Sequence, residues 1–573
     1  MKQREICIFQ KTDPILKCVA EITEHAKQHQ GDIIGVVLDG TSLIGSLSDG
    51  DIRRYLLSDS ADITLDAVDK AMSDNAVSVK EHQIDSIPKI LSSLERKIKS
   101  IFVVDESGDY CYTLGLEDSD EIFGGGNDVF ANQRIIVVGL GFVGLTLAVH
   151  IAKAGFSVVG VDANKVVVES LSDRVAPFFE QGLQSSLDGL SESSLSFENG
   201  ITKADGDTKT TFIVAVGTPI SNGEADVSQL KGAINNVAEN INNGDLLIIR
   251  STVPIGTCSG FVTSLMSEKS LVAGENYFLA MAPERTAEGV ALSELQTLPQ
   301  IIGADDSISL HLADGFFSEF SDSTINVGST VAAETCKLVC NSWRDLGFGF
   351  ANELATLCEA NDIDAFDLIN SCNFGYKRMT LPLPSPGVGG YCLTKDPLLY
   401  ASSGAKLPGA FSGNLSIDAR KANVIAGMAP DRALENFIRR IDPEKTKKLK
   451  LLVCGLTFKG APETDDIRYS TSIEFIDRAI LMGHDVIVTD SSDVVLSKVK
   501  NRLSVSSLRH KVEKDVDAIF VLNNNPENTN LNYSDWLISE GEKLFFDGWH
   551  QFNGYRHAFE DKAVKYATMG VVK

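Results

Sequence analysis

The sequence has no segment that resembles a leader or a membrane anchor. Its first residues, MKQREICIFQKTDP, lack the long apolar run and the small-residue cleavage site of a signal peptide. The longest apolar region, GLGFVGLTLAVHIAKAGFSVVGV, is interrupted by His150 and Lys153 and is rich in glycine. This region predicts a helix and a strand of a protein core rather than a membrane span. We therefore expect a cytoplasmic protein without a membrane partner.

Basic residues are also scarce. The chain has 52 Lys and Arg against 78 Asp and Glu, for a formal net charge of −26. Such a surface repels nucleic acid and anionic lipid, so neither is an expected partner. An anionic small-molecule substrate remains compatible with this charge, because one pocket can be basic while the whole surface is acidic.

The cysteines show no spacing pattern typical of a disulfide framework. Ten of them are scattered along a long chain, which suits a reducing compartment. Cys336 and Cys340 would share one face of a helix, but no second pair completes a metal site. We expect no bound metal.

The length of 573 residues predicts three or four domains at about 150 residues each. Residues 1–122 hold two similar units, GVVLDGTSLIGSLSDGDIRRYLL (35–57) and IFVVDESGDYCYTLGLEDSD (101–120). Each predicts a strand, a turn, a strand and a polar segment, with hairpin turns at LDG and DESGD. The segment FGGGNDVFANQ (123–133) is typical of a linker.

Strand and helix patterns alternate from Arg134 to about residue 315, and again after about residue 440. This alternation predicts two parallel sheets with crossover helices. Between them, residues 330–430 lose the strand runs. A helical spacing of apolar residues there predicts one long buried helix, with the apolar positions Leu338, Trp343, Leu346, Phe350, Leu354 and Leu357.

The stretch VVGLGFVGL carries Gly139, Gly141 and Gly144 as a GxGxxG motif between a predicted strand and a helix. Glycines at this spacing allow a tight turn and close approach of the backbone to a pyrophosphate at the helix N-terminus. Asp162 follows the next strand, about 20 residues further on, where a carboxylate binds the ribose hydroxyls and repels a 2′-phosphate. The motif therefore predicts NAD rather than NADP, and the alternative is a glycine turn without a dinucleotide.

Polar residues follow three further strands. VGTP (216–219) contains Thr218, RSTVPIGT (250–257) contains Ser251 and Thr252, and APER (282–285) contains Glu284. Ligands bind beyond the carboxyl ends of parallel strands, so these side chains are candidates for hydroxyl and carboxylate roles. Turn chemistry explains the Ser and Thr residues equally well, and Glu284 could instead be a helix-start carboxylate.

Two pairs of residues lie four apart on predicted helices. Lys337 and Asn341 share a face within an apolar stretch, although a helical lysine is more often solvated surface. Cys392 and Asp396 lie in SPGVGGYCLTKDP (385–397), just after a glycine run. If a helix begins near Tyr391, its N-terminus favours a thiolate and lowers the pKa of Cys392. The alternative is a small apolar filler.

An NAD site together with an activated cysteine points to one type of reaction. A thiolate can trap an aldehyde as a thiohemiacetal, from which a second hydride transfer gives a thioester that water hydrolyses. The combination predicts oxidation of an alcohol to a carboxylate with two NAD per substrate.

From about residue 132 to 550 the sequence resembles the nucleotide-sugar 6-dehydrogenases, the family of UDP-glucose, UDP-N-acetylhexosamine and GDP-mannose dehydrogenases. Seven motifs occur in family order: GLGFVGL, VGTP, STVPIGT, PER…EG, KLVCNSWR…ANELATLCE, PGVGGYCLTKDP and GLTFKG…TDDIRYS. The resemblance implies an α/β fold with two Rossmann-like domains, 132–325 and 441–573, joined by a helical domain, 326–440. The long central helix also implies a homodimer or a higher homo-oligomer.

The resemblance implies roles for individual residues. Cys392 would be the nucleophile, Lys337 would act with Asp396 and a water on the sugar alcohol, and Asn341 and Lys337 would stabilise oxyanions. Thr252 and Glu284 would position the hydrolytic water. The implied cofactor-binding residues are Gly139, Gly141, Phe142, Val143, Gly144, Asp162, Thr218 and Thr252. The implied substrate-binding residues are Glu284, Lys337, Asn341, Gly389, Lys459 and Arg468. The C-terminal domain lacks GxGxxG after its first strand and would hold the nucleotide diphosphate of the sugar.

The motifs favour a UDP-N-acetylhexosamine as substrate, in the synthesis of surface-polysaccharide precursors, with UDP-glucose as the alternative. PER and PGVGGYC are similar to the N-acetylhexosamine branch. The lysine before Asp396 is similar to the glucose and mannose enzymes, and Tyr391 replaces a histidine common in the N-acetyl branch.

The N-terminal region resembles a pair of cystathionine-β-synthase (CBS) domains, α+β in fold, through GSLSDGDIRR. The resemblance implies that Ser48 and Asp51 hold the ribose of an adenine nucleotide, with one good site at most. A structural or oligomerising module is the alternative. For the whole chain, a non-catalytic nucleotide sensor and an NAD-dependent epimerase are the competing classes, but neither has a use for an activated cysteine.

Overall fold

The structure is a computed structural model of the chain, and it divides into two compact units, Met1–Asn132 and Gln133–Lys573. It describes the chain apart from residues 1, 5, 29–33, 49–50, 53–54, 56–61, 63–65, 75, 87–99, 116–132, 204–207, 222–223, 404–408, 410, 445–446, 504, 509–510, 563 and 573. Most of the expected linker 123–133, and the polar segment expected after residue 115, lie outside the described residues.

The N-terminal unit contains two similar sets of strands. In one, β2 (Cys7–Gln10) runs parallel to β3 (Ile34–Asp39), which pairs antiparallel with β4 (Ser42–Ser48). In the other, β5 (Ser78–Lys80), β6 (Ser100–Val104) and β7 (Tyr110–Gly115) repeat this arrangement, and β1 (Lys2–Arg4) adds to β7. Helix α1 (Ile15–Gln28) follows β2. The two predicted hairpins are confirmed, because their turns lie at LDG and DESGD.

The second unit begins with an eight-stranded sheet in the order β10-β9-β8-β11-β14-β15-β16-β17. Its strands are β8 (Arg134–Val138), β9 (Val158–Val161), β10 (Leu195–Glu198), β11 (Thr210–Val214), β14 (Asp245–Ile249), β15 (Tyr277–Met281), β16 (Gln300–Ala304) and β17 (Thr324–Asn326). The first six are mutually parallel, whereas β16 is antiparallel to β15. The strand order reverses between β8 and β11, and ligands of such sheets bind at that point.

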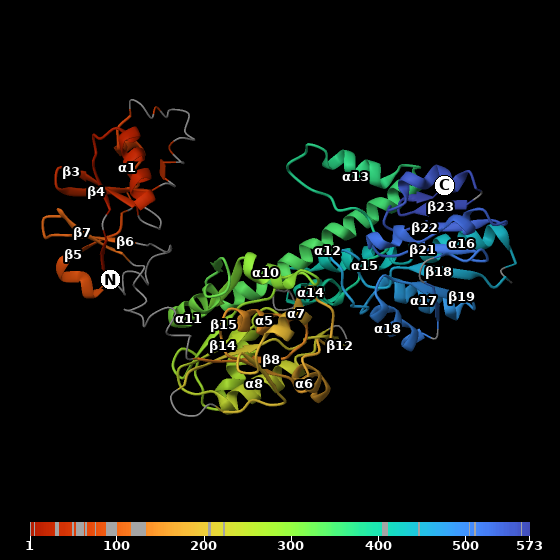
Figure 1. Cartoon of the computed structure of the whole chain (residues 1–573), viewed down its shortest axis with the longest axis horizontal. Helices are drawn as coiled ribbons and strands as arrows, with labels where there is room; N and C mark the ends of the chain where they lie inside the picture. The colour runs from red at the N-terminus through yellow and green to blue at the C-terminus, as the bar shows by residue number, and fades with distance from the viewer. Residues whose placement is uncertain are drawn as a thin grey trace. The chain divides into compact units, whose positions relative to one another are not determined.

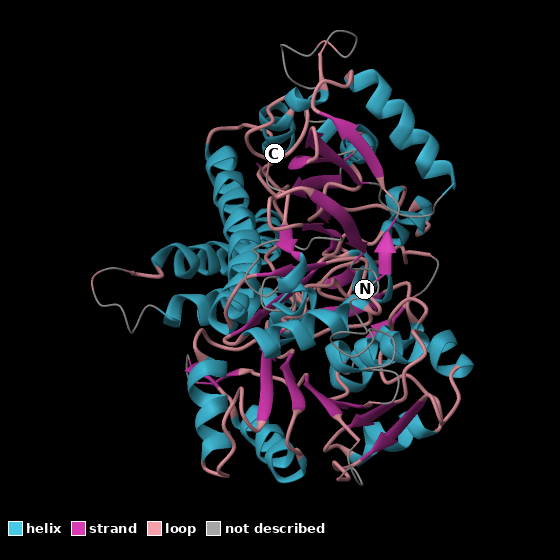
Figure 2. Ribbon diagram, turned by 90° about the vertical axis from the view of Figure 1, so that its left-hand side faces the viewer, coloured by secondary structure: helices cyan, strands magenta, loops and turns pink. Residues whose placement is uncertain are grey.

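Helices cover this sheet (Figures 1 and 2). They are α5 (Phe142–Lys153), α6 (Lys165–Ser172), α7 (Leu183–Gly189), α8 (Ser228–Asn240), α9 (Thr263–Ser267), α10 (Ala291–Thr297) and α11 (Ser307–Ser318). A short hairpin of β12 (Ile220–Ser221) and β13 (Glu224–Ala225) follows β11. Strands covered on both faces are mostly apolar, and β11 and β14 are buried throughout, with Thr210, Thr211 and Asp245 as their only polar residues.

The predicted long helix is α12 (Thr330–Ala360), which runs from the first sheet to the second (Figure 1). It begins at Ser329, whose hydroxyl accepts a hydrogen bond from the Ala332 amide at 3.2 Å. The prediction that its apolar stripe is buried is wrong in part, because Trp343 is 73% exposed, Phe350 54% and Leu357 61%. The packed face instead carries polar residues, which contact α14 and α15.

The remaining helices of this region are α13 (Ala365–Asn373), α14 (Tyr391–Ser402), α15 (Asn414–Ala426) and α16 (Ala429–Ile441). A seven-stranded sheet follows in the order β20-β19-β18-β21-β22-β23-β24. Its strands are β18 (Lys450–Cys454), β19 (Asp485–Thr489), β20 (Ser506–Ser507), β21 (Ala518–Val521), β22 (Lys543–Asp547), β23 (Val564–Thr568) and β24 (Val571–Val572). Its helices are α17 (Thr471–Leu481), α18 (Asp493–Leu503), α19 (Ser534–Leu537) and α20 (Arg556–Glu560). The first six strands repeat the order of the first sheet, so both predicted parallel sheets are confirmed.

Among the described residues, no helix has both the length and the apolar character that a membrane crossing needs.

Candidate active site

The glycine loop after β8 is shaped to receive an anion. Gly139 has a φ of 95°, and a Cβ added there would lie 2.8 Å from the Ala215 carbonyl oxygen. A Cβ added at Gly144 would lie 1.8 Å from the Gly139 carbonyl oxygen, so the loop and α5 pack too closely for any side chain. Around Gly141 there is open space, and α5 begins without a side-chain cap. Its first-turn amides are therefore open to a pyrophosphate.

Asp162 lies beside this loop, at the end of β9. Its carboxylate accepts hydrogen bonds from the Leu140 amide at 2.8 Å and the Asn164 amide at 2.8 Å. The first turn of α5 is formed by Phe142 and Val143. An uncapped helix N-terminus with an acid at the neighbouring strand end fits the pyrophosphate and ribose of NAD.

The hydroxyl groups after β11 and β14 are mostly used within the protein. Thr218 is buried, and its hydroxyl donates to the Thr252 carbonyl. The Ser251 hydroxyl donates to the Val216 carbonyl at 2.8 Å. These are hydrogen bonds that turn chemistry predicts for Thr218 and Ser251, and a role of Thr218 in cofactor binding stays a prediction. Thr252 is half-buried and follows the end of β14.

Glu284, at the end of β15, is held in a buried ion pair. Its carboxylate accepts hydrogen bonds from Arg250 Nη2 at 2.6 Å and from the amides of Arg285 and Thr286 at 2.6 and 2.7 Å. Burial alone would raise the pKa of Glu284, but the charge of Arg250, the Thr286 amide and the charge of Lys337 outweigh it and lower the pKa. Glu284 is therefore a stable carboxylate, better suited to orienting a group than to accepting a proton.

The two predicted pairs, on α12 and α14, come together. Asn341 Nδ2 donates to Asp396 Oδ2 at 2.6 Å, and all four residues except Cys392 are buried. Asp396 has a second partner, because Lys395 Nζ donates to its Oδ1 at 2.7 Å. The joint action of Lys337, Asp396 and a water stays a prediction. The charge of Lys337 helps to lower the pKa of Glu284, and it opposes the rise in the pKa of Cys392.

Cys392 lies in the first turn of α14, as predicted from the glycine run. Its expected low pKa is wrong for this conformation. Although the side chain is exposed, the surrounding protein raises the pKa of the Cys392 thiol, and the charge of Asp396 raises it further. Lys337 and Lys395 oppose this without overcoming it.

A buried polar network supports the loop that carries Cys392. Arg420 of α15 donates to Asp345 of α12 at 2.5 Å and to the carbonyls of Leu393 and Val388 at 3.2 and 3.3 Å. The same network links Asn423 to Asp345, Asn352 to Asn423 and Ser385 to Asn352. The polar face of α12 therefore fixes the backbone on both sides of Cys392.

Gly389 and Gly390, just before Cys392, allow the C-terminal domain to pack closely against this loop. A Cβ at Gly389 would lie 2.3 Å from the Tyr469 carbonyl oxygen, and one at Gly390 would lie 2.8 Å from the Phe458 ring. Arg468, next to Tyr469, lies against the ring of Tyr391, the residue before Cys392. The loop at 464–470 therefore packs so closely against Gly389 that no side chain fits there. This packing places Arg468, a predicted substrate-binding residue, near the cysteine.

Lys459 and Glu288 connect the two sheets. Lys459 Nζ donates to the Glu288 carbonyl at 2.6 Å, and burial lowers the pKa of Lys459. Burial and the charge of Asp466 raise the pKa of Glu288 to about 7. The sequence analysis assigned no role to Glu288 or Arg250. It used Lys395, the lysine before Asp396, only to compare the sugar branches and did not predict its ion pair with Asp396.

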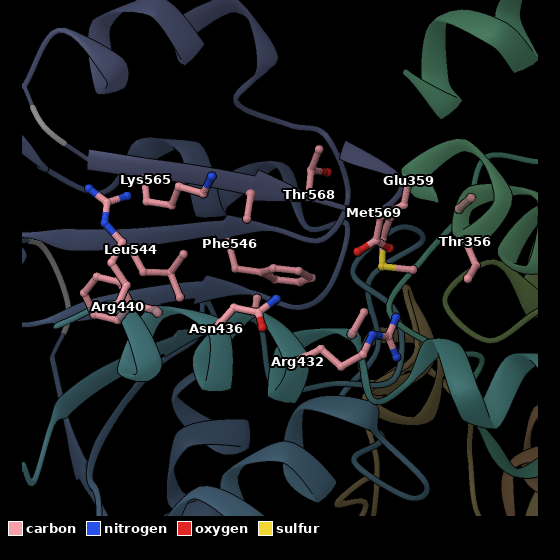
Figure 3. A pocket seen from close by; sticks show the side chains of 16 residues that line it. Thr356, Glu359, Arg432, Asn436, Arg440, Leu544, Phe546, Lys565, Thr568 and Met569 are labelled. Atoms are coloured by element: carbon pink, nitrogen blue, oxygen red, sulfur yellow. The ribbon is translucent and has the colours of Figure 1, made fainter. Parts of the chain in front are cut away.

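A separate pocket of about 220 Å³ lies in the C-terminal half of the unit, between α16 and strands β22 and β23 (Figure 3). Arg432, Asn436 and Arg440 line it from α16, and Phe546 and Lys565 line it from the strands. None of the predicted site residues lines this pocket. Within the described part of the chain, no cluster of His, Cys, Asp and Glu could hold a metal ion.

The comparisons with known proteins agree with this geometry. The models of the UDP-glucose/GDP-mannose dehydrogenase family match in three parts: the NAD binding domain at residues 133–321, the central domain at 331–412 and the UDP binding domain at 452–554. The chain belongs to this family. It is a nucleotide-sugar dehydrogenase with an NAD-binding domain and a UDP-binding domain.

Individual relatives are similar over the same region. The chain is 31% identical to a UDP-N-acetyl-D-mannosamine dehydrogenase of Pyrococcus horikoshii over 417 residues, 73% of this chain and 95% of the relative. The solved structure of UDP-D-ManNAc dehydrogenase from the same organism has a TM-score of 0.65 and 28% identity, and covers 76% of this chain and 99% of that chain. A UDP-glucose dehydrogenase from Pyrobaculum islandicum has a TM-score of 0.64 and 25% identity, and covers 77% and 98%.

Proposed function

We propose that the protein oxidises the 6-hydroxyl of a UDP-N-acetylhexosamine to a carboxylate, with UDP-N-acetyl-D-mannosamine as the first candidate and UDP-glucose as the alternative. The placement of Cys392 supports this proposal. It lies at the start of α14, where the charges of Asp396 and Lys337 act on it and Asn341 binds Asp396. The UDP-binding domain packs against the two glycines just before it. The names of the relatives support the N-acetyl sugar.

The reaction balances in two oxidations. The 6-hydroxyl loses its proton and C6 loses a hydride, which gives an aldehyde. The Cys392 thiolate then adds to the carbonyl carbon, and the oxygen takes up a proton to give a thiohemiacetal. Loss of a proton and a second hydride gives a thioester, and water cleaves the C–S bond to release the carboxylate and the thiol. NAD, when bound, accepts one hydride in each oxidation.

The other residues stabilise charge. The charge of Lys337 acts on Cys392 and would stabilise an oxyanion on the reacting carbon. Asp396 accepts a hydrogen bond from the Asn341 amide and so fixes its orientation. The same amide would then donate to the oxyanion. Glu284, kept ionised by Arg250, and Thr252 orient the hydrolytic water.

The count of NADH per sugar tests the proposal. We expect two NADH per UDP-N-acetyl-D-mannosamine consumed, with UDP-N-acetylglucosamine, UDP-N-acetylgalactosamine, UDP-glucose and GDP-mannose as the comparison panel. A preference for UDP-glucose would select the alternative substrate. One NADH per sugar would remove the cysteine step, and none with any sugar would reject the proposal in favour of a non-catalytic sensor.

We also propose that residues 1–122 form a CBS-domain pair that binds an adenine nucleotide. The repeated strand arrangement supports a duplicated module. Asp51 is buried, and its carboxylate accepts hydrogen bonds from the Ser48 amide and hydroxyl at 2.9 and 2.5 Å. These are the two residues that the resemblance assigns to the ribose.

A thermal shift on the full chain tests this second proposal. AMP, ADP or ATP should raise the melting temperature of the wild type, because a ligand that binds only the folded state stabilises it. The Asp51→Ala variant should lose the shift, and Asp69→Ala, an exposed acid of the same unit, should keep it. A shift that persists in Asp51→Ala, or no shift with any of the three nucleotides, would contradict the proposal.

Finally, we propose that the protein is a homodimer through the exposed face of α12, which presents Val339, Trp343, Phe350 and Leu357. Soluble monomers rarely expose an apolar stripe of this kind. A second copy of the same helix offers a surface of matching chemistry.

A further inference from the structure

Tyr391 lies between the two halves of the proposed active site, and neither the reaction nor the cofactor loop accounts for it. It is the first residue of α14, directly before Cys392, and it is half-buried. The Arg468 guanidinium carbon lies 5.1 Å from the centroid of its ring, and Lys395 Nζ lies 5.4 Å from the same centroid. The ring therefore has two cations at the distance where a π face attracts them.

The tyrosine also reaches the cofactor side. A Cβ added at Gly217, in the loop after β11, would lie 3.8 Å from the Tyr391 hydroxyl oxygen. The ring of Tyr469 lies 6.3 Å from the Tyr391 ring, centroid to centroid. One side chain thus spans from the first domain to the loop at 464–470 of the second, at the position next to the nucleophile.

Arg468 needs such a support. Its side chain is 55% exposed, and its ion pair with Asp466, at 2.7 Å, joins residues of the same loop. That pair cannot fix the loop relative to α14. A second carboxylate, Glu288, is 3.9 Å away. Of these contacts, the Tyr391 ring is the one that ties the guanidinium to the helix carrying Cys392.

We propose that Tyr391 is a positioning residue that holds the guanidinium of Arg468 over the start of α14, where the sugar nucleotide binds. The ring carries this role, and the hydroxyl does not. The inference rests on the proposed function in that Arg468 is taken to contact the UDP-sugar. It adds that recognition of the sugar nucleotide depends on an aromatic side chain next to the nucleophile.

Steady-state kinetics on the full chain test the inference, with UDP-N-acetyl-D-mannosamine and NAD varied separately. The Tyr391→Ala variant should raise the KM for the UDP-sugar by between about 2- and 30-fold, the range of a cation–π contact. The KM for NAD and kcat should stay within about twofold, since a merely loosened helix would change all three. Tyr391→Phe should behave as wild type, because it keeps the ring, and so should Tyr400→Phe, which lies on the same helix against Phe411.

A double-mutant cycle makes the test decisive. In an Arg468→Ala background, Tyr391→Ala should cause no further rise in the KM for the UDP-sugar. The inference is overturned if Tyr391→Phe is as impaired as Tyr391→Ala, since the hydroxyl would then act, or if Tyr391→Ala has its full effect without Arg468. If the wild type turns over no sugar nucleotide, the proposed function fails by itself. The same cycle is then read from the Kd for UDP by calorimetry, with the same criteria.

Discussion

We expect replacement of Cys392 by serine to abolish acid formation, with a loss of at least about 10³-fold, the order expected when a covalent nucleophile is removed. Serine keeps the size of the side chain, but its hydroxyl does not ionise at neutral pH and cannot trap the aldehyde as the thiolate does. The measurement is the amount of uronic acid formed per UDP-sugar, by mass spectrometry, beside the NADH count.

The matched control for this variant is Cys111→Ser, which changes an exposed thiol of the N-terminal unit. It should form acid at the wild-type rate. Acid production by Cys392→Ser at a rate near that of the control would remove Cys392 from the mechanism. A variant that accumulates aldehyde would instead show that the first oxidation does not need the thiol.

The raised pKa of Cys392 gives the same residue a pH signature. A thiol with a raised pKa is mostly protonated at pH 7, so its reactivity rises as the pH increases through a midpoint above the usual thiol range. The rate of alkylation by iodoacetamide, with Cys392→Ser as the blank, should show this rise. A midpoint below the usual range would support the effect of the helix N-terminus that the sequence alone suggested. The midpoint is measured without substrate, because the charge of a bound UDP-sugar would itself shift the pKa of Cys392.

Parts of the site follow from sequence because they depend on local order. Gly139, Gly141 and Gly144 have a fixed spacing after an apolar strand, and Asp162 ends the next strand, so their meeting is a property of one βαβ unit. The start of α14 at Tyr391 was predictable for the same reason, since a glycine run precedes it.

The pairings inside the site could not be predicted in the same way. Lys395 and Asp396 are neighbours on a helix, where adjacent side chains normally diverge, so their ion pair depends on the tertiary structure around them. The pair of Arg250 and Glu284 needs the order of β14 and β15 in the sheet. The pKa of Cys392 depends on the protein packed around it, which no spacing records.

The long helix shows the limit of periodicity most clearly. An apolar stripe on α12 indicates a face that avoids water, but it does not indicate whether the same chain or a second copy covers that face. In this chain the covered face also carries polar residues, among them Asn341, Asp345 and Asn352, whose hydrogen bonds are met by α14 and α15. Trp343, Phe350 and Leu357 of the apolar stripe stay exposed, whereas Leu338 is buried.

The assignment of this face to a second copy predicts a large effect of Trp343→Glu. Trp343 is 73% exposed within one chain, so a charge there costs the folded monomer little. At the centre of a dimer interface, the loss of a tryptophan and the burial of an unpaired carboxylate should weaken association at least about 30-fold. Light scattering after size exclusion, at low micromolar protein, should show a dimer for the wild type and a monomer for the variant. Leu481→Glu, which places the same charge at an 86% exposed position on α17, should remain a dimer. A Trp343→Glu variant with the mass of the wild type would leave this face uncovered by a second copy, and the apolar stripe of α12 would then need another partner.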